Sequence, residues 1–236
     1  MESKRLVAKH PLFVRITHWI NGPVLLIMLY SGLLIYWAND VYEISIGGFV
    51  LVKFFPAWFY KLLDLEGGLA RGMSLHFAFA WFFTINGVIY VALTFLTGYW
   101  RHLCPNRRTP IEAFHVLLHD LKLRKEKPPQ GIFNAAQKMA YCGVIAMGAG
   151  SLLTGLAILK PVQLSWLLWC FGGYEFARLI HFALTIGYVL FFCIHIAQVI
   201  RAGWNNFRAM VAGYEVATVP PEPPHEPRIE AAVPAG

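Results

Sequence analysis

The chain has 236 residues, of which 57% are hydrophobic and only 14% are charged. Soluble domains carry about 25% charged residues, so this composition excludes an ordinary soluble domain and indicates an integral membrane protein. The net charge of +7 reflects where lysine and arginine lie relative to the membrane, as described below, so we expect no nucleic-acid partner. The four cysteines form no Cys-x-x-Cys pair, which argues against a thiolate metal site.

Four apolar segments are long enough to cross a bilayer as helices. They predict an all-α membrane protein built as a four-helix transmembrane bundle, with interfacial helices between the spans. The basic N-terminus resembles a secretory signal, but the apolar run after it is too long and lacks a small-residue cleavage site, so we expect an uncleaved span. The expected spans lie at about residues 14–37, 72–100, 132–159 and 178–201.

The connections between the spans contain further apolar segments. Residues 38–72 are apolar but are interrupted by Lys53 and Pro56. We expect residues 44–63 to form an interfacial helix, and a fifth span is the alternative. A short amphipathic helix and a second interfacial segment are expected at Ile111 to Lys125 and at residues 160–174.

The end of the chain differs in composition from the rest. Residues 215–236 are rich in proline and poor in apolar side chains, so they cannot bury enough surface to fold and we expect disorder. Residues 1–214 are therefore expected to form one transmembrane domain.

The distribution of basic residues predicts the orientation of the spans. With four spans, the two termini and the 101–131 connection share one side, and that side carries fifteen of the twenty lysines and arginines when Lys138 is included. Basic residues accumulate on the cytoplasmic side of membrane proteins, so we expect both termini to be cytoplasmic.

Four of the nine histidines fall within the apolar spans: His18, His76, His181 and His195. His181 and His195 are fourteen residues apart on one span, which separates them by about 21 Å along the axis and leaves them on nearly the same helix face. The topology puts His18 level with His195 near the cytoplasmic side, and His76 level with His181 near the outer side. Ionisable residues in a membrane usually mark function.

Two histidine pairs at two depths predict bis-imidazole ligation of two haems held between helices. The alternative is four separate interfacial histidines, each bonded to a carbonyl. The second ring nitrogen of each ligand needs a partner, for which Thr17, Thr185 and backbone carbonyls are candidates. His115 and His119 are four residues apart but lack a third ligand, so we expect a solvated helix face.

Other residues near these depths have two interpretations. Glycines, including Gly22, Gly32 and Gly87, either let a macrocycle approach the backbone or allow close helix packing. Three arginines at span ends either pair with haem propionates or act as ordinary interfacial anchors: Arg15, Arg71 and Arg178.

Short motifs at the span ends carry a family resemblance: RITHWI, LHFAFAW, NAAQKMAY, TGLAI, ARLIHF and IHIAQV. Over about residues 8–214 the chain resembles the bacterial cytochrome b561 and nickel–iron hydrogenase cytochrome b family. The opening KHPLFVRITHW and the later YWAND resemble its thiosulfate-reductase-like branch. The resemblance implies two non-covalent b haems, with His18 paired with His195 and His76 paired with His181.

The resemblance also implies a quinone site. In the formate dehydrogenase subunit of this family, an N-A-x-Q-K segment lies beside the cytoplasmic haem, and it corresponds here to Asn134, Gln137 and Lys138 with the alanines between. Polar amides just inside an interface suit hydrogen bonds to quinone carbonyls. Asn134 and Gln137 also match the pattern of a helix capping box, and the two roles are compatible.

These expectations together describe an electron-transfer subunit of the bacterial inner membrane. It would pass electrons between quinone and a periplasmic-side partner, either a molybdopterin oxidoreductase or a hydrogenase, directly or through an iron–sulfur subunit. The partner would dock on residues 38–72 and 160–175. The alternatives are a self-contained quinone-linked cytochrome b oxidoreductase and a proton-relay transporter without haem.

Overall fold

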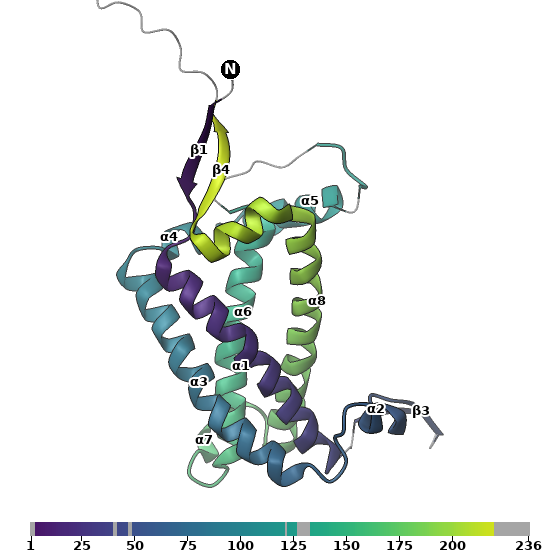
Figure 1. Ribbon diagram of the computed structural model, residues 1–236. Helices are drawn as coiled ribbons and strands as arrows, with labels where there is room; N and C mark the ends of the chain where they lie inside the picture. The colour runs from purple at the N-terminus through teal and green to yellow at the C-terminus, as the bar shows by residue number, and fades with distance from the viewer. Residues whose placement is uncertain (1–2, 40–41, 47–48, 121, 127–132, 220–236) are drawn as a thin grey trace, which may run out of the picture.

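The computed structural model describes residues 3–39, 42–46, 49–120, 122–126 and 133–219. Four long helices form its body (Figure 1): α1 (Leu12–Trp37), α3 (Leu69–Leu96), α6 (Ala135–Leu159) and α8 (Tyr174–Ala212). Each is long and apolar enough to cross a membrane. The predicted four-helix membrane bundle is therefore confirmed.

The ends of these helices are set by local backbone signals. Asn134 caps α6, because its side chain accepts a hydrogen bond from the Gln137 backbone N–H. After α3, Gly98 has a positive φ of 72° and starts a turn into the short helix α4 (Trp100–Leu103). Gly203, with φ 78° and ψ 177°, breaks α8. The membrane-spanning part of α8 thus ends close to the predicted residue 201, and residues 204–212 turn across the end of the bundle (Figure 1).

The bundle consists of two closely packed helix pairs. α1 packs along α3, and α6 packs along α8, whereas contacts between the two pairs are sparse. The α1–α3 approach is close at Gly72, where an added Cβ would lie 2.7 Å from Leu34 Cβ and 3.1 Å from the Ser31 carbonyl oxygen. The buried Asn86 amide also joins this pair, donating to the Thr17 carbonyl and to the Asn21 side chain at 2.9 and 2.7 Å. Glycine at the contact and interhelical amide bonds are typical of helix association in membranes.

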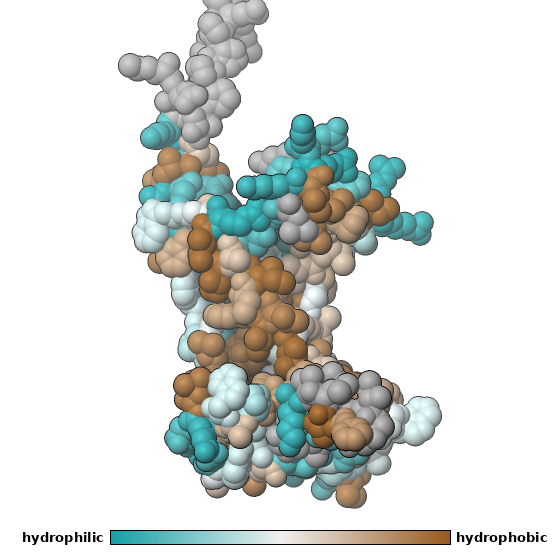
Figure 2. All heavy atoms as spheres, turned by 90° about the vertical axis from the view of Figure 1, so that its right-hand side faces the viewer, coloured by the Kyte–Doolittle hydropathy of each residue, from teal (hydrophilic) through white to brown (hydrophobic). Residues whose placement is uncertain are grey.

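The surface is layered along the bundle axis. In Figure 2 hydrophobic side chains form a band between the two ends, and hydrophilic side chains lie at both ends, most of them at the upper one. One end, here called the terminal end, carries α4, the helix α5 (Thr109–Asp120) and the strands β1 (Ser3–Ala8) and β4 (Tyr214–Val219). The other, called the hairpin end, carries β2 (Glu43–Ile46), β3 (Phe49–Lys53), α2 (Ala57–Leu62) and α7 (Ser165–Cys170).

The connections agree in part with the sequence analysis. The amphipathic helix expected near residues 111–125 is α5, and α7 lies within the apolar 160–174 connection. The single interfacial helix expected over residues 44–63 is wrong, and so is the fifth span. β2 and β3 form an antiparallel pair followed by the six-residue α2. β-branched residues alternate through these strands and favour extended backbone, and Pro56 starts α2.

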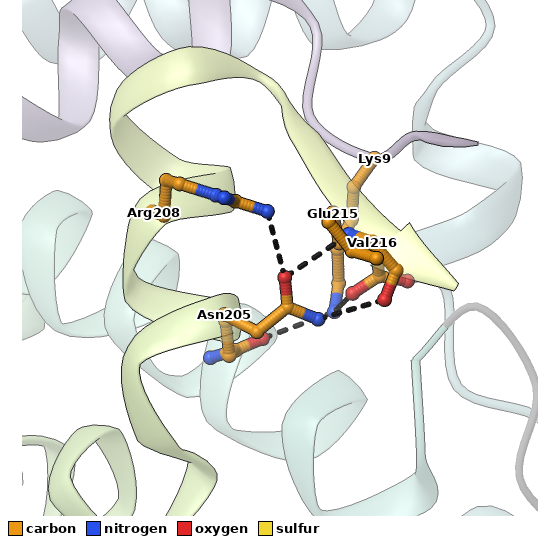
Figure 3. A network of polar contacts seen from close by, with 6 residues as sticks. Lys9, Asn205, Arg208, Glu215 and Val216 are labelled. Carbon is orange, nitrogen blue, oxygen red and sulfur yellow. Dashed lines mark hydrogen bonds and ion pairs between the residues drawn. The ribbon is translucent and has the colours of Figure 1, made fainter. Parts of the chain in front are cut away.

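The disorder expected from residue 215 onward is wrong for residues 215–219, and residues 220–236 lie outside the described part of the chain. β4 pairs antiparallel with β1, with Ala8 opposite Tyr214 and Ser3 opposite Val219. The Asn205 side chain bonds both the N–H and the carbonyl of Val216, each at 3.0 Å (Figure 3). Lys9 bonds Glu215 and, at 3.0 Å, Asn206. These contacts fasten the beginning and the end of the described chain together.

Replacing Gly72 with alanine is expected to destabilise the protein. The new methyl group would meet the α1 backbone, which cannot yield as a flexible side chain does, and overpacking of this kind costs about 1–3 kcal/mol. Gly87→Ala on the same helix is the matched control, since nothing lies within 4 Å of its added Cβ. Denaturant titration in detergent measures both variants, and equal stabilities would contradict the close packing at Gly72.

Acid is expected to destabilise the terminal end through His10. Burial, with the Lys9 charge as the second cause, lowers the pKa of His10 from 6.5 to about 4. As the pH falls from about 6.5 toward 4, the unfolded chain takes up a proton that the folded protein does not, so the free energy of unfolding decreases. Thermal unfolding of the wild type and of His10→Gln, measured between about pH 6.5 and pH 4, tests this loss of stability. A variant with the same pH dependence as the wild type would contradict the assignment.

Candidate haem-binding site

The structure brings the four intramembrane histidines together in two pairs. At the terminal end, the ring centres of His18 on α1 and His195 on α8 are 6.0 Å apart, with the rings inclined by 57°. At the hairpin end, the ring centres of His76 on α3 and His181 on α8 are 6.2 Å apart, inclined by 69°. These are the two pairs predicted from span depth, and α8 contributes to both.

The donor set at each site fits a metal held in a macrocycle. Among the described residues, no group of three or more histidine, cysteine, aspartate or glutamate side chains could hold a metal ion, whereas a bare zinc ion takes three or four protein ligands. A haem iron needs only two axial ligands from the protein. Two metal–imidazole bonds of about 2 Å on opposite sides of one iron put the ring centres about 6.4 Å apart. Both histidine pairs match this separation.

At the hairpin end, hydroxyl groups hold the second nitrogen of each imidazole. His76 Nδ1 is 3.0 Å from Ser31 Oγ, and His181 Nδ1 is 2.9 Å from Thr154 Oγ1. Ser31 donates its own proton to the Met28 carbonyl at 3.1 Å, and Thr154 donates to the Gly150 carbonyl at 2.7 Å. With its proton on a carbonyl, each hydroxyl can accept from an Nδ1–H, and this tautomer leaves Nε2 of both rings unprotonated and able to bind iron.

Sequence reasoning missed Ser31 and Thr154. The hydroxyls it named bond the backbone instead: Thr17 donates to the Phe13 carbonyl at 2.8 Å and Thr185 to the His181 carbonyl at 3.1 Å. Ser31 and Thr154 lie on the helices packed against α3 and α8, so only the rotation of one helix against another reveals their role. The sequence carries one signal of this role: in both cases a serine or threonine followed by glycine lies at the membrane depth of a histidine.

At the terminal end, aromatic contacts surround the histidine pair. The His195 ring stacks on Phe191 at 5.8 Å and 13°, and the His18 ring meets the Trp19 ring edge-on at 5.5 Å. His18 Nδ1 is buried and has no hydrogen-bond partner among the described residues. The two sites therefore share a ligand geometry but differ in how the rings are held.

The glycines divide between the two interpretations. Gly72 serves close packing of α1 and α3, whereas an added Cβ at Gly22, Gly87 or Gly143 would meet nothing within 4 Å. Gly32 and Gly155 face the ligand rings, because an added Cβ would lie 3.7 Å from His76 Cε1 and 3.3 Å from His181 Cε1 respectively. Close helix packing therefore occurs at Gly72, and contact of Gly32 and Gly155 with a macrocycle stays a prediction.

The three arginines lie at span ends and have protein partners. Arg15 donates to the Ala212 carbonyl at 2.9 Å, and its buried Nε has no partner among the described residues. Arg71 bonds the Tyr30 hydroxyl at 3.2 Å and Asp64, and Arg178 bonds Glu175 at 3.3 Å. Their pairing with propionates stays a prediction.

The proposed quinone residues lie at the start of α6. Asn134 and Gln137 form a reciprocal capping box, in which each side-chain oxygen accepts from the other's backbone N–H, at 2.8 and 2.9 Å. No residue that the structure describes accepts a hydrogen bond from the amide nitrogen of either side chain. Phe133 stacks on His10 at 6.3 Å, which brings the start of α6 close to that of α1 at the terminal end.

Comparison with known proteins identifies the family. The family described as prokaryotic cytochrome b561 matches residues 9–213. The chain is also 33% identical, over 213 residues, to the putative protein-methionine-sulfoxide reductase subunit YedZ1 of Azospira oryzae, a match that covers 90% of this chain and all of that protein. Together with the four spanning helices, these matches show that the chain belongs to the prokaryotic cytochrome b561 family and is a multi-pass membrane protein of a family that binds b-type haem.

Proposed function

We propose that this protein holds two b haems and transfers electrons across the membrane, between a catalytic partner on one side and quinone on the other. The observation that carries the proposal is the pair of imidazole contacts, 6.0 and 6.2 Å between ring centres, at opposite ends of one bundle. Haem supplies one-electron chemistry when bound. The chain supplies the axial nitrogens, the distance between the sites and an apolar environment.

The proposed ligands are His18 with His195 for one haem and His76 with His181 for the other. Within the hairpin-end pair, the Ser31 and Thr154 hydroxyls contact Nδ1 of each ring and so support the tautomer with an unprotonated Nε2, which ligation requires. α8 provides one ligand to each haem, so a single rigid helix fixes the distance between the two sites.

We place quinone at the terminal end, beside the His18–His195 pair. The Asn134 and Gln137 amide nitrogens are not used by the capping box and suit hydrogen bonds to quinone carbonyls. Lys138 adds a positive charge that would stabilise a reduced, anionic quinone oxygen. Arg15 belongs to this end too, lining an open apolar hollow of about 380 Å³ with Ile16, Trp19, Ile20 and Val211.

We propose that the terminal end faces the cytoplasm of a bacterium and that the protein lies in the inner membrane. Support comes from the excess of lysine and arginine in the segments at that end. The hairpin end then faces the periplasm, where a catalytic subunit docks. The relative from Azospira oryzae is named as a subunit of a methionine-sulfoxide reductase, and we propose a molybdopterin oxidoreductase of that general kind, with a hydrogenase as the alternative.

The docking surface at the hairpin end is rich in exposed apolar side chains. Large exposed patches on membrane-protein ends mark contacts with lipid headgroups or with partner proteins. The most exposed apolar side chains described in α2, β3, α7 and the segment before α7 are Phe49, Trp58, Leu62, Val162, Trp166 and Trp169.

Purified protein is expected to contain two haems per chain. Replacing His76 or His181 with alanine removes an axial ligand and is expected to deplete one spectral species, and replacing His18 or His195 is expected to deplete the other. Haem-to-protein ratios and reduced-minus-oxidised spectra measure this. A colourless preparation of inserted wild-type protein, or loss of the same species from His18→Ala and His76→Ala, would refute the proposed ligation.

The quinone site is tested by variants that keep the helix cap. Asn134→Asp and Gln137→Glu retain the oxygen acceptors of the capping box but remove the amide donors, so the helix should remain and quinone binding should weaken. We expect KM for a soluble quinone to rise by about tenfold or more, the equivalent of one lost hydrogen bond of about 1.4 kcal/mol, with haem content unchanged. Unaltered quinone kinetics in both variants would exclude this site. Turnover by the purified chain alone would instead favour the self-contained oxidoreductase.

A further inference from the structure

We propose that two Ser/Thr–Gly pairs, Ser31–Gly32 on α1 and Thr154–Gly155 on α6, hold the His76 and His181 imidazoles in the same way. We propose further that these contacts make the hairpin-end haem electronically distinct from the terminal-end haem. Each Ser/Thr–Gly pair, here called a hydroxyl–glycine seat, fixes one ring as its Nδ1–H tautomer. The inference rests on the proposed ligation of haem by these two histidines.

In the inferred arrangement, the hydroxyl of each seat acts as an acceptor toward the ring. Ser31 Oγ and Thr154 Oγ1 each have a backbone carbonyl one turn earlier in their own helix as the acceptor for their single proton. A hydroxyl that donates to this carbonyl presents a lone pair to the imidazole, which matches an N–H at Nδ1. Ser31 and Thr154 are both fully buried, so water does not compete for these bonds.

The glycine of each seat gives the ring its space. An alanine at position 155 would place its Cβ 3.3 Å from His181 Cε1, closer than ordinary van der Waals contact, and one at position 32 would just touch His76 Cε1 at 3.7 Å. The hydroxyl and the glycine are adjacent in sequence, so one helix turn both bonds the ring and accommodates it. The same arrangement occurs twice, on α1 and on α6, which are far apart in the sequence.

Each seat lies on the helix that packs against the ligand's own helix. α1 contacts the His76 ring of α3, and α6 contacts the His181 ring of α8, so each imidazole is oriented by contacts within its own helix pair. The terminal-end site lacks this arrangement. His18 Nδ1 is buried without a partner in the described structure, and the neighbouring Thr17 hydroxyl is used by the Phe13 carbonyl.

The consequence is a difference in the donor strength of the axial nitrogens. A ligand imidazole that donates Nδ1–H to an acceptor has a more basic Nε2, which favours the oxidised, more positive iron. Both ligands of the hairpin-end haem have such an acceptor. We therefore expect the seats to lower the midpoint potential of that haem and to leave the other unaffected.

The experiment is a redox titration of the purified full chain and its variants. Ser31→Ala and Thr154→Val remove one acceptor each, and each is expected to raise the midpoint potential of the species that His76→Ala and His181→Ala deplete. Thr185→Val is the matched control, because its hydroxyl lies one turn beyond His181 but bonds only the backbone. Thr154→Ser keeps a hydroxyl and should keep the wild-type potential.

An unchanged hairpin-end potential in both Ser31→Ala and Thr154→Val would overturn the inference, as would an equal rise in Thr185→Val. Should Thr154→Val lose the haem, recovery in Thr154→Ser supports the seat, and failure to recover contradicts it.

A second readout uses haem-free protein with ¹⁵N-labelled histidine. His76 and His181 should show the Nδ1–H tautomer, and this signature should weaken in Ser31→Ala and Thr154→Val respectively. An Nε2–H tautomer in the wild type would overturn the inference even where both haems bind. Wild-type protein that binds no haem would refute the proposed function, while the ¹⁵N spectrum would still decide whether the seats exist.

Discussion

A buried imidazole has two nitrogens to satisfy, and inside a membrane no water is present to satisfy either of them. At the hairpin end, Nδ1 of His76 and Nδ1 of His181 each bond a hydroxyl, and the two ring centres are 6.2 Å apart. In the proposed site, the haem iron would bind the Nε2 atom of both rings. At the terminal end, His18 Nδ1 has no hydrogen-bond partner among the described residues. The two ends therefore differ in how their histidine nitrogens are hydrogen-bonded.

The helices that carry these histidines form two closely packed pairs. α1 and α3 approach closely at Gly72 and share the Asn86 amide bonds, and α6 packs along α8. Contacts between the two pairs are sparse, yet each histidine couple joins a helix of one pair to α8 of the other. Ligation at two depths would therefore hold together halves that side-chain packing alone joins weakly, giving the cofactors a structural as well as an electronic role.

The sequence predicts the features that depend only on hydropathy and on position along a span. Hydropathy located the four spans, and depth along the spans paired His18 with His195 and His76 with His181. The Ser31 and Thr154 contacts could not be predicted, because they depend on how two helices rotate against each other. The 44–63 segment was misread because its apolar content was weighed above the β-branched alternation of β2 and β3. β4 was missed because its partner strand lies about two hundred residues earlier in the chain.

That separation has a consequence for biosynthesis. β1 is made first and β4 last, so the two-stranded ribbon cannot close until every intervening helix has left the ribosome and entered the bilayer. The Lys9–Glu215 ion pair and the hydrogen bonds from Asn205 to Val216 therefore form last. They can form only when an even number of membrane crossings has returned the chain to its starting side. A protein with one helix left out would carry its last strand on the wrong side of the lipid, with its edges open and exposed to quality-control proteases.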